Sequence, residues 1–208
     1  MKQSDIKTEK RDFSKINYNV PSNSKIYIAM GKGDNNANEC YTTYKTANNL
    51  VQYLLNYPLI EHDEKIWFPF DCEDSNIYLA FKNNGFKNLI YTHFENSENF
   101  YEMEVDCDII ISNPPFSRHK IGDKSYGRTD LFNRLFKLDK PFIMLQPTQM
   151  LNNLSIIKHL TEKSPNIGFI CPENRTGFII NGIEKNSPAF YSFWMCYKMG
   201  LSKMWNNM

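Results

Sequence analysis

The sequence predicts an α/β fold in which helices cover a mostly parallel β-sheet. Short apolar runs of strand length alternate along the chain with segments whose apolar residues recur at helical spacing. The run 106–112 is apolar on successive residues at its centre, which is typical of a parallel strand buried on both faces. Two strand-like runs near the C-terminus, 167–171 and 189–197, predict an antiparallel pair that closes the sheet. Ligands of such a sheet bind beyond the carboxyl ends of its strands.

The expected elements follow one another in a regular order. Strands are predicted at residues 25–30, 65–71, 88–92, 106–112, 141–145, 167–171 and 189–197. Helices are predicted at residues 43–55, 77–85, 131–138 and 154–160. Asp74 or Ser75 is placed to cap the second helix, and Gly85 to end it. Residues 1–24 are polar with alternating charges and are interpreted as a flexible arm, which leaves 25–208 as a single domain.

Length and composition narrow the classes of function. The 208 residues are 41% hydrophobic and 23% charged, as in an ordinary soluble globular domain. Because 24 Lys+Arg nearly balance 23 Asp+Glu, the net charge of +1 excludes a highly basic nucleic-acid coat, and nucleic-acid binding has to be local. Five cysteines without a CxxC pair argue against a zinc ribbon or a disulfide framework, so a cytoplasmic protein is expected. No apolar run approaches the roughly 20 residues that span a bilayer, so no membrane insertion is expected.

The motif that carries chemistry is Asn113-Pro-Pro-Phe116, directly after an apolar strand. Pro114 and Pro115 fix two φ angles near −65° and remove two backbone donors. The local carbonyls and the Asn113 side chain therefore form a rigid group of acceptors beside an aromatic ring. Such a group can accept both hydrogens of a planar amine while Phe116 stacks on the ring that carries it. The alternative interpretation is a rigid turn that follows a strand.

This tetrad resembles the [DNS]PP[YFW] signature of the S-adenosylmethionine-dependent amino-methyltransferases, especially the adenine-N6 enzymes. The resemblance spans roughly residues 38–199 and implies a Rossmann-like class I methyltransferase fold, with a mostly parallel seven-stranded sheet and a C-terminal antiparallel hairpin. It implies S-adenosyl-L-methionine as the cofactor. It also implies catalytic roles for Asn113, Pro114, Pro115 and Phe116, in which Asn113 and the Pro114 carbonyl orient the amine and Phe116 stacks on an extruded adenine. Relatives with this tetrad methylate RNA adenine, the guanine N2 amine or a glutamine amide, so the substrate stays open.

The segment 68–75 stands where that family has a glycine-containing motif, aligned as DPFxGxG, that cradles the cofactor. Phe68 replaces the usual acid, and Cys72 and Asp74 replace the two glycines, a variant that resembles small phage-type methyltransferase-like proteins. Its three acidic residues could meet the cofactor's ammonium group or ribose hydroxyls. The residues expected to bind the cofactor here are Pro69, Phe70, Asp71, Glu73, Asp74 and Ser75. The alternative is a capped helix start with solvated acids.

Two further segments resemble cofactor contacts of the family. Tyr41 and Thr42 match an aromatic-Thr-Pro motif that precedes the first strand, although Thr43 replaces the proline. Asn99 and Phe100 stand where relatives place Asp-Phe against the cofactor's adenine. The resemblance implies that both pairs bind the cofactor.

A base inside a duplex is methylated on its amine only after extrusion, so such an enzyme needs a basic rim that holds the backbone. The segment 117–128 follows the tetrad and is expected to form that rim as a mobile loop, because it contains Gly122 and Gly127. The residues expected to bind substrate phosphates are Arg118, Lys120, Lys124 and Arg128. The alternative is an exposed, solvated loop.

The chain offers no obvious target-recognition insert, since only 149–188 could contribute one. Three alternatives follow for target specificity. The enzyme has relaxed specificity, a protein partner supplies it, or the substrate is structured RNA that is recognised by its shape. The order of the motifs favours DNA adenine over RNA adenine as the substrate. A methyltransferase-like nucleic-acid or protein-binding module without activity stays open because the motif glycines are missing. A nucleotide-handling transferase is disfavoured because no GK[ST] loop is present.

Overall fold

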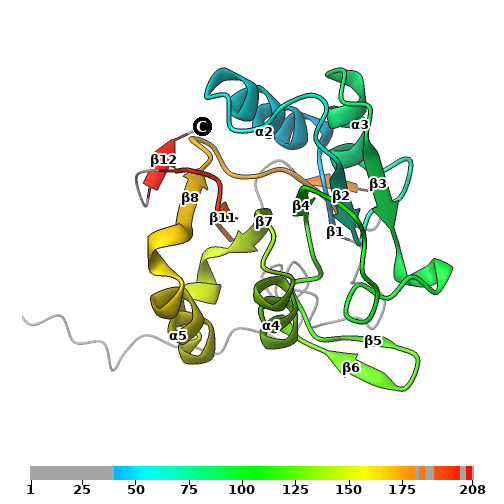
Figure 1. Cartoon of the computed structure of the whole chain (residues 1–208), viewed down its shortest axis with the longest axis vertical. Helices are drawn as coiled ribbons and strands as arrows, with labels where there is room; N and C mark the ends of the chain where they lie inside the picture. The colour runs from blue at the N-terminus through cyan, green and yellow to red at the C-terminus, as the bar shows by residue number, and fades with distance from the viewer. Residues whose placement is uncertain (1–39, 181–182, 186–189, 202–204, 208) are drawn as a thin grey trace, which may run out of the picture.

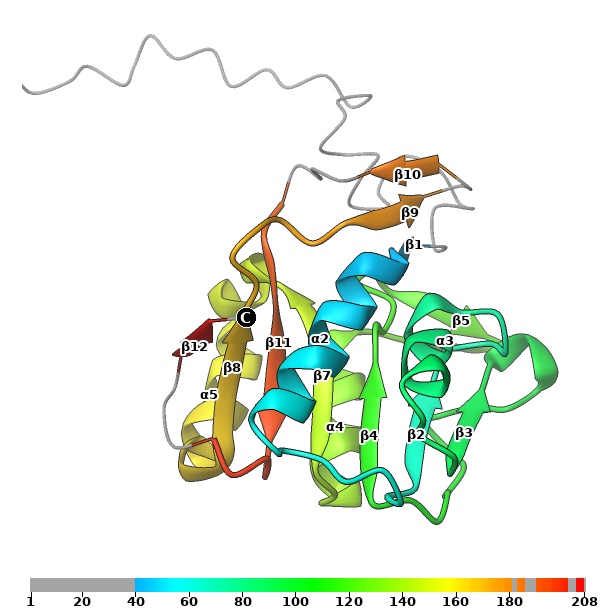
Figure 2. The same cartoon turned by 90° about the horizontal axis from the view of Figure 1, so that it is seen from above.

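The computed structural model describes residues 40–180, 183–185, 190–201 and 205–207. The arm expected at 1–24 and the strand expected at 25–30 lie outside these ranges. The described chain forms three layers, with a β-sheet between two pairs of helices (Figures 1 and 2). Helices α2 and α3 cover one face of the sheet, and α4 and α5 cover the other.

The helices begin and end close to their predicted bounds. They are α2 (Tyr44–Asn56), α3 (Asn76–Asn83), α4 (Arg128–Leu138) and α5 (Leu154–Glu162). Short 3-10 helices lie at Phe94–Asn96, Thr148–Asn152 and Ser164–Asn166. Ser75, one of the two predicted caps, accepts a hydrogen bond from the Tyr78 N–H at the start of α3. Gly85 follows that helix with a φ of 90°, a conformation that favours glycine.

Within the described ranges, the central sheet has seven strands and is mixed. In spatial order they are β12 (Trp205–Asn207), β8 (Ile167–Cys171), β11 (Ser192–Tyr197), β7 (Phe142–Pro147), β4 (Ile109–Ser112), β2 (Ile66–Pro69) and β3 (Leu89–Thr92). Strands β3, β2, β4 and β7 run parallel, and β12 is parallel to β8. Strand β11 is antiparallel to both of its neighbours. The carboxyl ends of β2 and β4 consequently meet at one edge of the sheet.

The predicted closing pair is antiparallel but is not a simple C-terminal hairpin. Trp194 of β11 lies opposite Ile170 of β8. The connection between these strands contains β9 (Phe178–Ile180) and β10 (Ile183–Lys185), which form a second sheet with β1 (Cys40–Thr42). Sequence periodicity does not predict β9 and β10, because strands of three residues carry no periodic signal and β9 pairs with a strand far away in the sequence.

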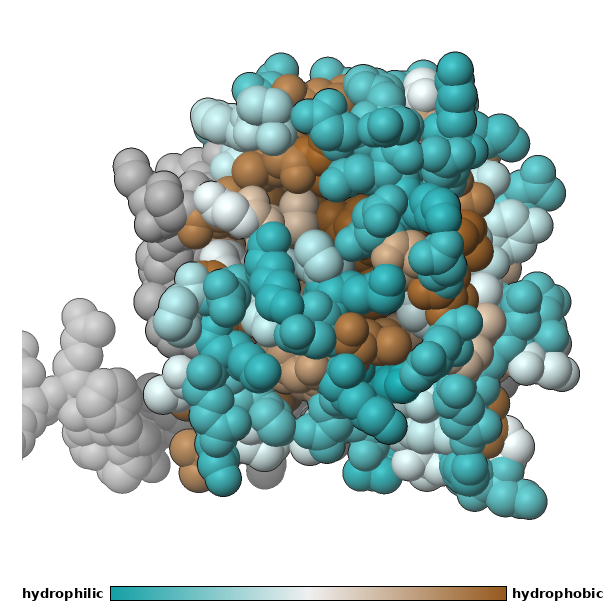
Figure 3. All heavy atoms as spheres, viewed as in Figure 1, coloured by the Kyte–Doolittle hydropathy of each residue, from teal (hydrophilic) through white to brown (hydrophobic). Residues whose placement is uncertain are grey.

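The core fills both faces of the central sheet. Along β4, Ile109 and Ile111 pack in the cluster that contains α2 and α3 residues, whereas Ile110 packs with α4 residues. This alternation arises because successive strand residues point to opposite faces. Polar side chains cover much of the face seen in Figure 1, with apolar side chains visible between them (Figure 3). Among the described residues, no helix combines the length and apolar character that crossing a bilayer requires.

Candidate functional site

The carboxyl edge of the sheet joins the tetrad to the predicted cofactor segment. Asn113 follows β4 directly, and the segment after Pro69 leaves the neighbouring strand β2. The Ser112 hydroxyl donates a hydrogen bond to the carboxylate of Asp71, with 2.6 Å between the two oxygens. Ser112 Oγ also lies within hydrogen-bond reach of the Pro69 carbonyl oxygen. Both contacts hold the start of the tetrad against the loop that follows β2.

Asp71 is the buried acid of this loop. Its residue is only 3% exposed, and burial raises the pKa of its carboxyl to about 7, although hydrogen bonds from Ser112 and Ser75 act to lower it. Glu73 and Asp74 are exposed. The three acids expected to face a cofactor therefore divide into one that holds the loop together and two that a ligand can reach.

Phe70 makes the turn after β2 with a left-handed backbone, at a φ of 70°. This conformation costs a residue with a side chain about 1–2 kcal/mol, and glycine is the usual residue there. The Phe70 ring is buried, and its centroid lies 5.0 Å from that of Phe100 and 6.2 Å from that of His119. The loop therefore turns without the motif glycines, and Phe70 packs into the core beneath the site.

The predicted pair Tyr41 and Thr42 lies beside the same loop. The Asn76 side-chain amide donates a hydrogen bond of 2.8 Å to the Thr42 carbonyl, which joins β1 to the start of α3. Thr42 is buried and Tyr41 is half-buried. Through this hydrogen bond the second sheet contacts the start of α3, although the two segments are far apart in the sequence.

The predicted pair Asn99 and Phe100 has structural contacts of its own. The Asn99 amide donates to the Tyr126 hydroxyl at 3.2 Å, and its oxygen accepts from the Tyr101 N–H at 3.0 Å. Phe100 is buried at 2% exposure, and the buried Arg134 guanidinium donates to its carbonyl at 3.3 Å. Asn99 and Phe100 therefore contact neighbouring parts of the protein near the carboxyl edge of the sheet.

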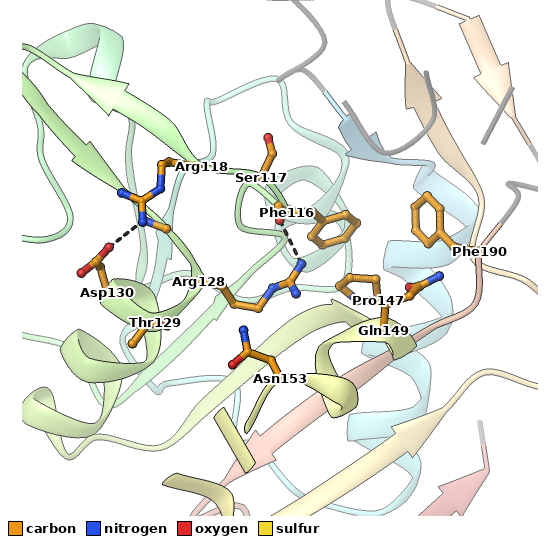
Figure 4. Close-up of a pocket in the computed structure, with 11 residues that line it drawn as sticks. Phe116, Ser117, Arg118, Arg128, Thr129, Asp130, Pro147, Gln149, Asn153 and Phe190 are labelled. Atoms are coloured by element: carbon orange, nitrogen blue, oxygen red, sulfur yellow. Dashed lines mark hydrogen bonds between the residues drawn. The ribbon is translucent and has the colours of Figure 1, made fainter. Parts of the chain in front are cut away.

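The tetrad itself is held between two aromatic residues and an arginine. The Phe116 ring meets Phe178 and Phe190 edge-on, at centroid distances of 6.0 and 5.8 Å. Arg128 Nη2 donates a hydrogen bond of 2.9 Å to the Phe116 carbonyl (Figure 4). Asn113 is half-buried and Pro114 is buried. The ring of Phe116 therefore has a fixed orientation.

The expected mobile loop at 117–128 is a hairpin. It consists of β5 (His119–Ile121) and β6 (Lys124–Tyr126), and Gly122 turns between them with a φ of 58°. Tyr126 stacks on Tyr101 at 3.9 Å with an interplanar angle of 4°. The expectation of a loop is wrong because Tyr126 packs against Tyr101, which lies outside the segment. This contact stabilises the two short strands.

The four basic residues expected to bind substrate lie in different environments. Lys124 pairs with Glu102 at 2.5 Å, which offsets its charge. Lys120 is exposed on β5, and Arg118 is exposed. Arg128 is half-buried, and burial lowers the pKa of its guanidinium. The structure therefore brings only Arg128 into contact with the tetrad backbone.

A pocket of about 460 Å³ opens beside Phe116. Figure 4 shows residues from several elements around it, including Arg128 at the start of α4 and Pro147 at the end of β7. Sequence reasoning missed Pro147, Gln149 and Asn153. A usable signal exists for them, since Pro147 ends a buried strand and Gln149 and Asn153 follow it. Within the described residues, no group of three or more His, Cys, Asp or Glu side chains is arranged to hold a metal ion.

Comparisons with known proteins find similarity in fold only. No family model matches the chain, and no curated protein matches it. Among solved structures, a Listeria monocytogenes protein assigned as a class I S-adenosylmethionine-dependent methyltransferase is similar, with 12% identity, 89% of this chain and 73% of that chain covered, and a TM-score of 0.49.

Two further solved structures are similar at lower scores. A protein of Vibrio vulnificus YJ016 assigned as a modification subunit of a type I restriction enzyme has 12% identity and a TM-score of 0.47. The match covers 83% of this chain and 46% of that chain. A Pyrococcus horikoshii protein assigned as an RNA methyltransferase has 11% identity and a TM-score of 0.41. The match covers 74% of this chain and 84% of that chain. All three TM-scores lie below 0.5, so these similarities do not assign a function to this chain.

Proposed function

We propose that this chain is an S-adenosylmethionine-dependent methyltransferase that acts on the exocyclic N6 amine of adenine in DNA. The observation that supports the proposal is the position of Asn113–Phe116 directly after β4. The hydrogen bond from Ser112 to Asp71 holds this motif against the loop after β2. A rigid group of acceptors beside an aromatic ring suits a planar amine. The adjoining loop supports a cofactor site next to that amine.

The side chains around this loop fit S-adenosyl-L-methionine by their chemistry. Glu73 and Asp74 present exposed carboxylates, which suit an ammonium group and ribose hydroxyls. Tyr41 and Thr42 lie beside the same loop and would complete the site. When bound, the cofactor supplies an electrophilic methyl group.

The residues of the tetrad orient the amine and hold its protons. The Asn113 side-chain oxygen and the Pro114 carbonyl accept the two amine hydrogens, while Phe116 stacks on the base. This arrangement points the nitrogen lone pair away from the tetrad. The proton that a methylated amine gives up would pass to water, because neutral carbonyl and amide oxygens accept hydrogen bonds without taking up the proton.

Incubation with methyl-labelled cofactor and separate pools of DNA, RNA and protein tests this function. Label in DNA, recovered as N6-methyladenine after digestion, is the expected result. Label in RNA alone would change the substrate class, and label in protein alone would contradict a base substrate. Absence of label in all three pools, with protein that melts cooperatively, would contradict the enzyme function.

A second candidate is a methyltransferase-like binding module without cofactor affinity. The buried rings of Phe70 and Phe100 at the edge of the sheet favour it, because they fill part of the space under the predicted cofactor segment. Calorimetric titration separates the two candidates, since heat of binding at millimolar cofactor supports the enzyme and its absence supports the module. A protein partner that supplies target recognition, a cytoplasmic location and the single-domain organisation stay predictions from the sequence.

A further inference from the structure

The pocket beside Phe116 combines aromatic walls with guanidinium groups. Phe116 and Phe190 provide the aromatic part of its lining, and Arg118 and Arg128 provide the cations. Its volume of about 460 Å³ lies in the range of small-molecule sites. An occupant of this pocket would therefore meet both a flat apolar surface and positive charge.

Arg128 is the unusual member of this lining. Its guanidinium is half-buried, and Nη2 donates to the Phe116 carbonyl at 2.9 Å. Among the described residues, its buried Nε has no hydrogen-bond partner. Burial lowers the pKa of this group. A partly desolvated cation of this kind gains free energy from an anion in the adjoining pocket.

Arg118 and Asp130 also line this pocket. The Asp130 carboxylate accepts a hydrogen bond from the Gly127 N–H at 2.7 Å (Figure 4). The lining thus contains two guanidinium groups and one carboxylate. Arg118 is exposed whereas Arg128 is half-buried, so solvent screens the charge of Arg118 more than that of Arg128.

We propose that this pocket binds a purine nucleotide, with the phosphate group on the Arg128 guanidinium and the base against Phe116. The planar guanidinium matches phosphate oxygens, and aromatic rings accept a base by stacking. The assignment rests on the proposed function, because it identifies the nucleotide whose amine the tetrad would hold. It goes further by making the pocket selective for a phosphorylated nucleotide over a free nucleoside.

Binding of three probes tests the site without turnover. Calorimetry measures the affinity of the wild-type chain for adenosine 5′-monophosphate, adenosine and inorganic phosphate at low salt. We expect the monophosphate to bind about tenfold more tightly than adenosine, the difference that one charge-assisted contact provides. Equal affinity for adenosine and the monophosphate would overturn the site. Phosphate that binds as tightly as the monophosphate would show an anion site without nucleotide recognition, which also overturns it.

Two matched variants assign the preference to one residue. Arg128→Gln removes the charge but keeps a hydrogen-bond donor, and we expect it to abolish the preference for the monophosphate. Arg118→Gln removes an equal charge from the same lining and should change the preference by less than about threefold, because Arg118 is exposed and solvent screens its charge. Arg128→Lys, which keeps the charge, should retain part of the preference and shows whether a loss in Arg128→Gln reflects charge or misfolding. An unchanged preference in folded Arg128→Gln would contradict the proposal.

These outcomes separate the site from the proposed function. A chain that prefers the monophosphate through Arg128 but labels no DNA, RNA or protein keeps the site and loses the methyltransferase function. A chain that labels DNA but binds adenosine and the monophosphate equally keeps the function and loses this site.

Discussion

The hydroxyl of Ser112 and the carboxylate of Asp71 join two parallel strands at the edge where the candidate site lies, with 2.6 Å between their oxygens. Ser112 ends β4, one residue before the tetrad, and Asp71 lies in the loop after β2. Both residues are buried, so water does not compete for this bond. The contact joins the tetrad, which is predicted to bind the substrate amine, to the predicted cofactor segment.

Replacing Ser112 with alanine should destabilise the protein and misplace the tetrad. The change leaves a buried carboxyl with one donor fewer, which costs about 1–3 kcal/mol of unfolding free energy. We also expect the KM for the nucleic acid to rise. Urea unfolding and initial rates measure both effects, with Ser125→Ala on the exposed part of β6 as the control. Equal stability of the two variants would show that the Ser112 hydroxyl contributes nothing.

Asp71 should make stability depend on pH. Its carboxyl has a pKa of about 7 in the folded chain against 3.8 for an ordinary aspartate, so the native state binds more protons between these values. Unfolding free energy should therefore fall as the pH rises through that window, by on the order of 4 kcal/mol, and level off above it. Unfolding at pH 5, 6, 7 and 8 measures this slope. Asp71→Asn should flatten it, and a wild-type slope in that variant would assign the effect to other groups.

At position 70, a glycine variant should be more stable than an alanine variant, which is the reverse of the usual order. Both Phe70→Ala and Phe70→Gly lose a buried ring, which costs about 3–5 kcal/mol. At the left-handed φ of Phe70, however, glycine avoids the strain that alanine keeps, so Phe70→Gly should be about 1 kcal/mol more stable than Phe70→Ala. Thermal and urea unfolding of both variants provide the comparison. The ordinary order, with alanine more stable, would show that Phe70 is not strained.

Asn113 and Phe116 should carry methyl transfer. Asn113→Ala removes a proposed acceptor for the amine and Phe116→Ala removes the stacking ring, so each should lower the rate with labelled cofactor at least about 100-fold. Phe116→Tyr keeps a ring and should retain most of the activity. Melting curves check the Phe116 variants, because this ring contacts Phe178 and Phe190. Wild-type rates in Asn113→Ala would remove the tetrad from the mechanism.

The β5–β6 hairpin should depend on the stacked pair Tyr101 and Tyr126. Tyr126→Ala removes a ring that lies 3.9 Å from its partner, and we expect faster amide hydrogen exchange over residues 119–126. Lys124→Gln removes an exposed ion pair with Glu102 and should leave the stability unchanged, because solvent screens exposed charges. Exchange that is already fast across the wild-type hairpin would restore the interpretation of 117–128 as a mobile loop.

Much of the fold can be predicted from the sequence because its signals are local. The spacing of apolar residues defines α2, the oxygen of Ser75 caps α3, and the continuous apolar run defines β4. The position of Asn113–Phe116 after a buried strand likewise follows from order along the chain. These features depend on neighbours within a few residues, which periodicity and capping describe.

The remaining features depend on contacts between distant residues. Strand β9 forms because it pairs with β1, and the β5–β6 hairpin is ordered by Tyr101. Three predicted ligand contacts, Asp71, Phe100 and Arg128, have internal partners in the structure. The sequence by itself determined which residue types follow the strands. Only the tertiary structure decided which of them are buried, because burial depends on packing between segments that are far apart in the chain.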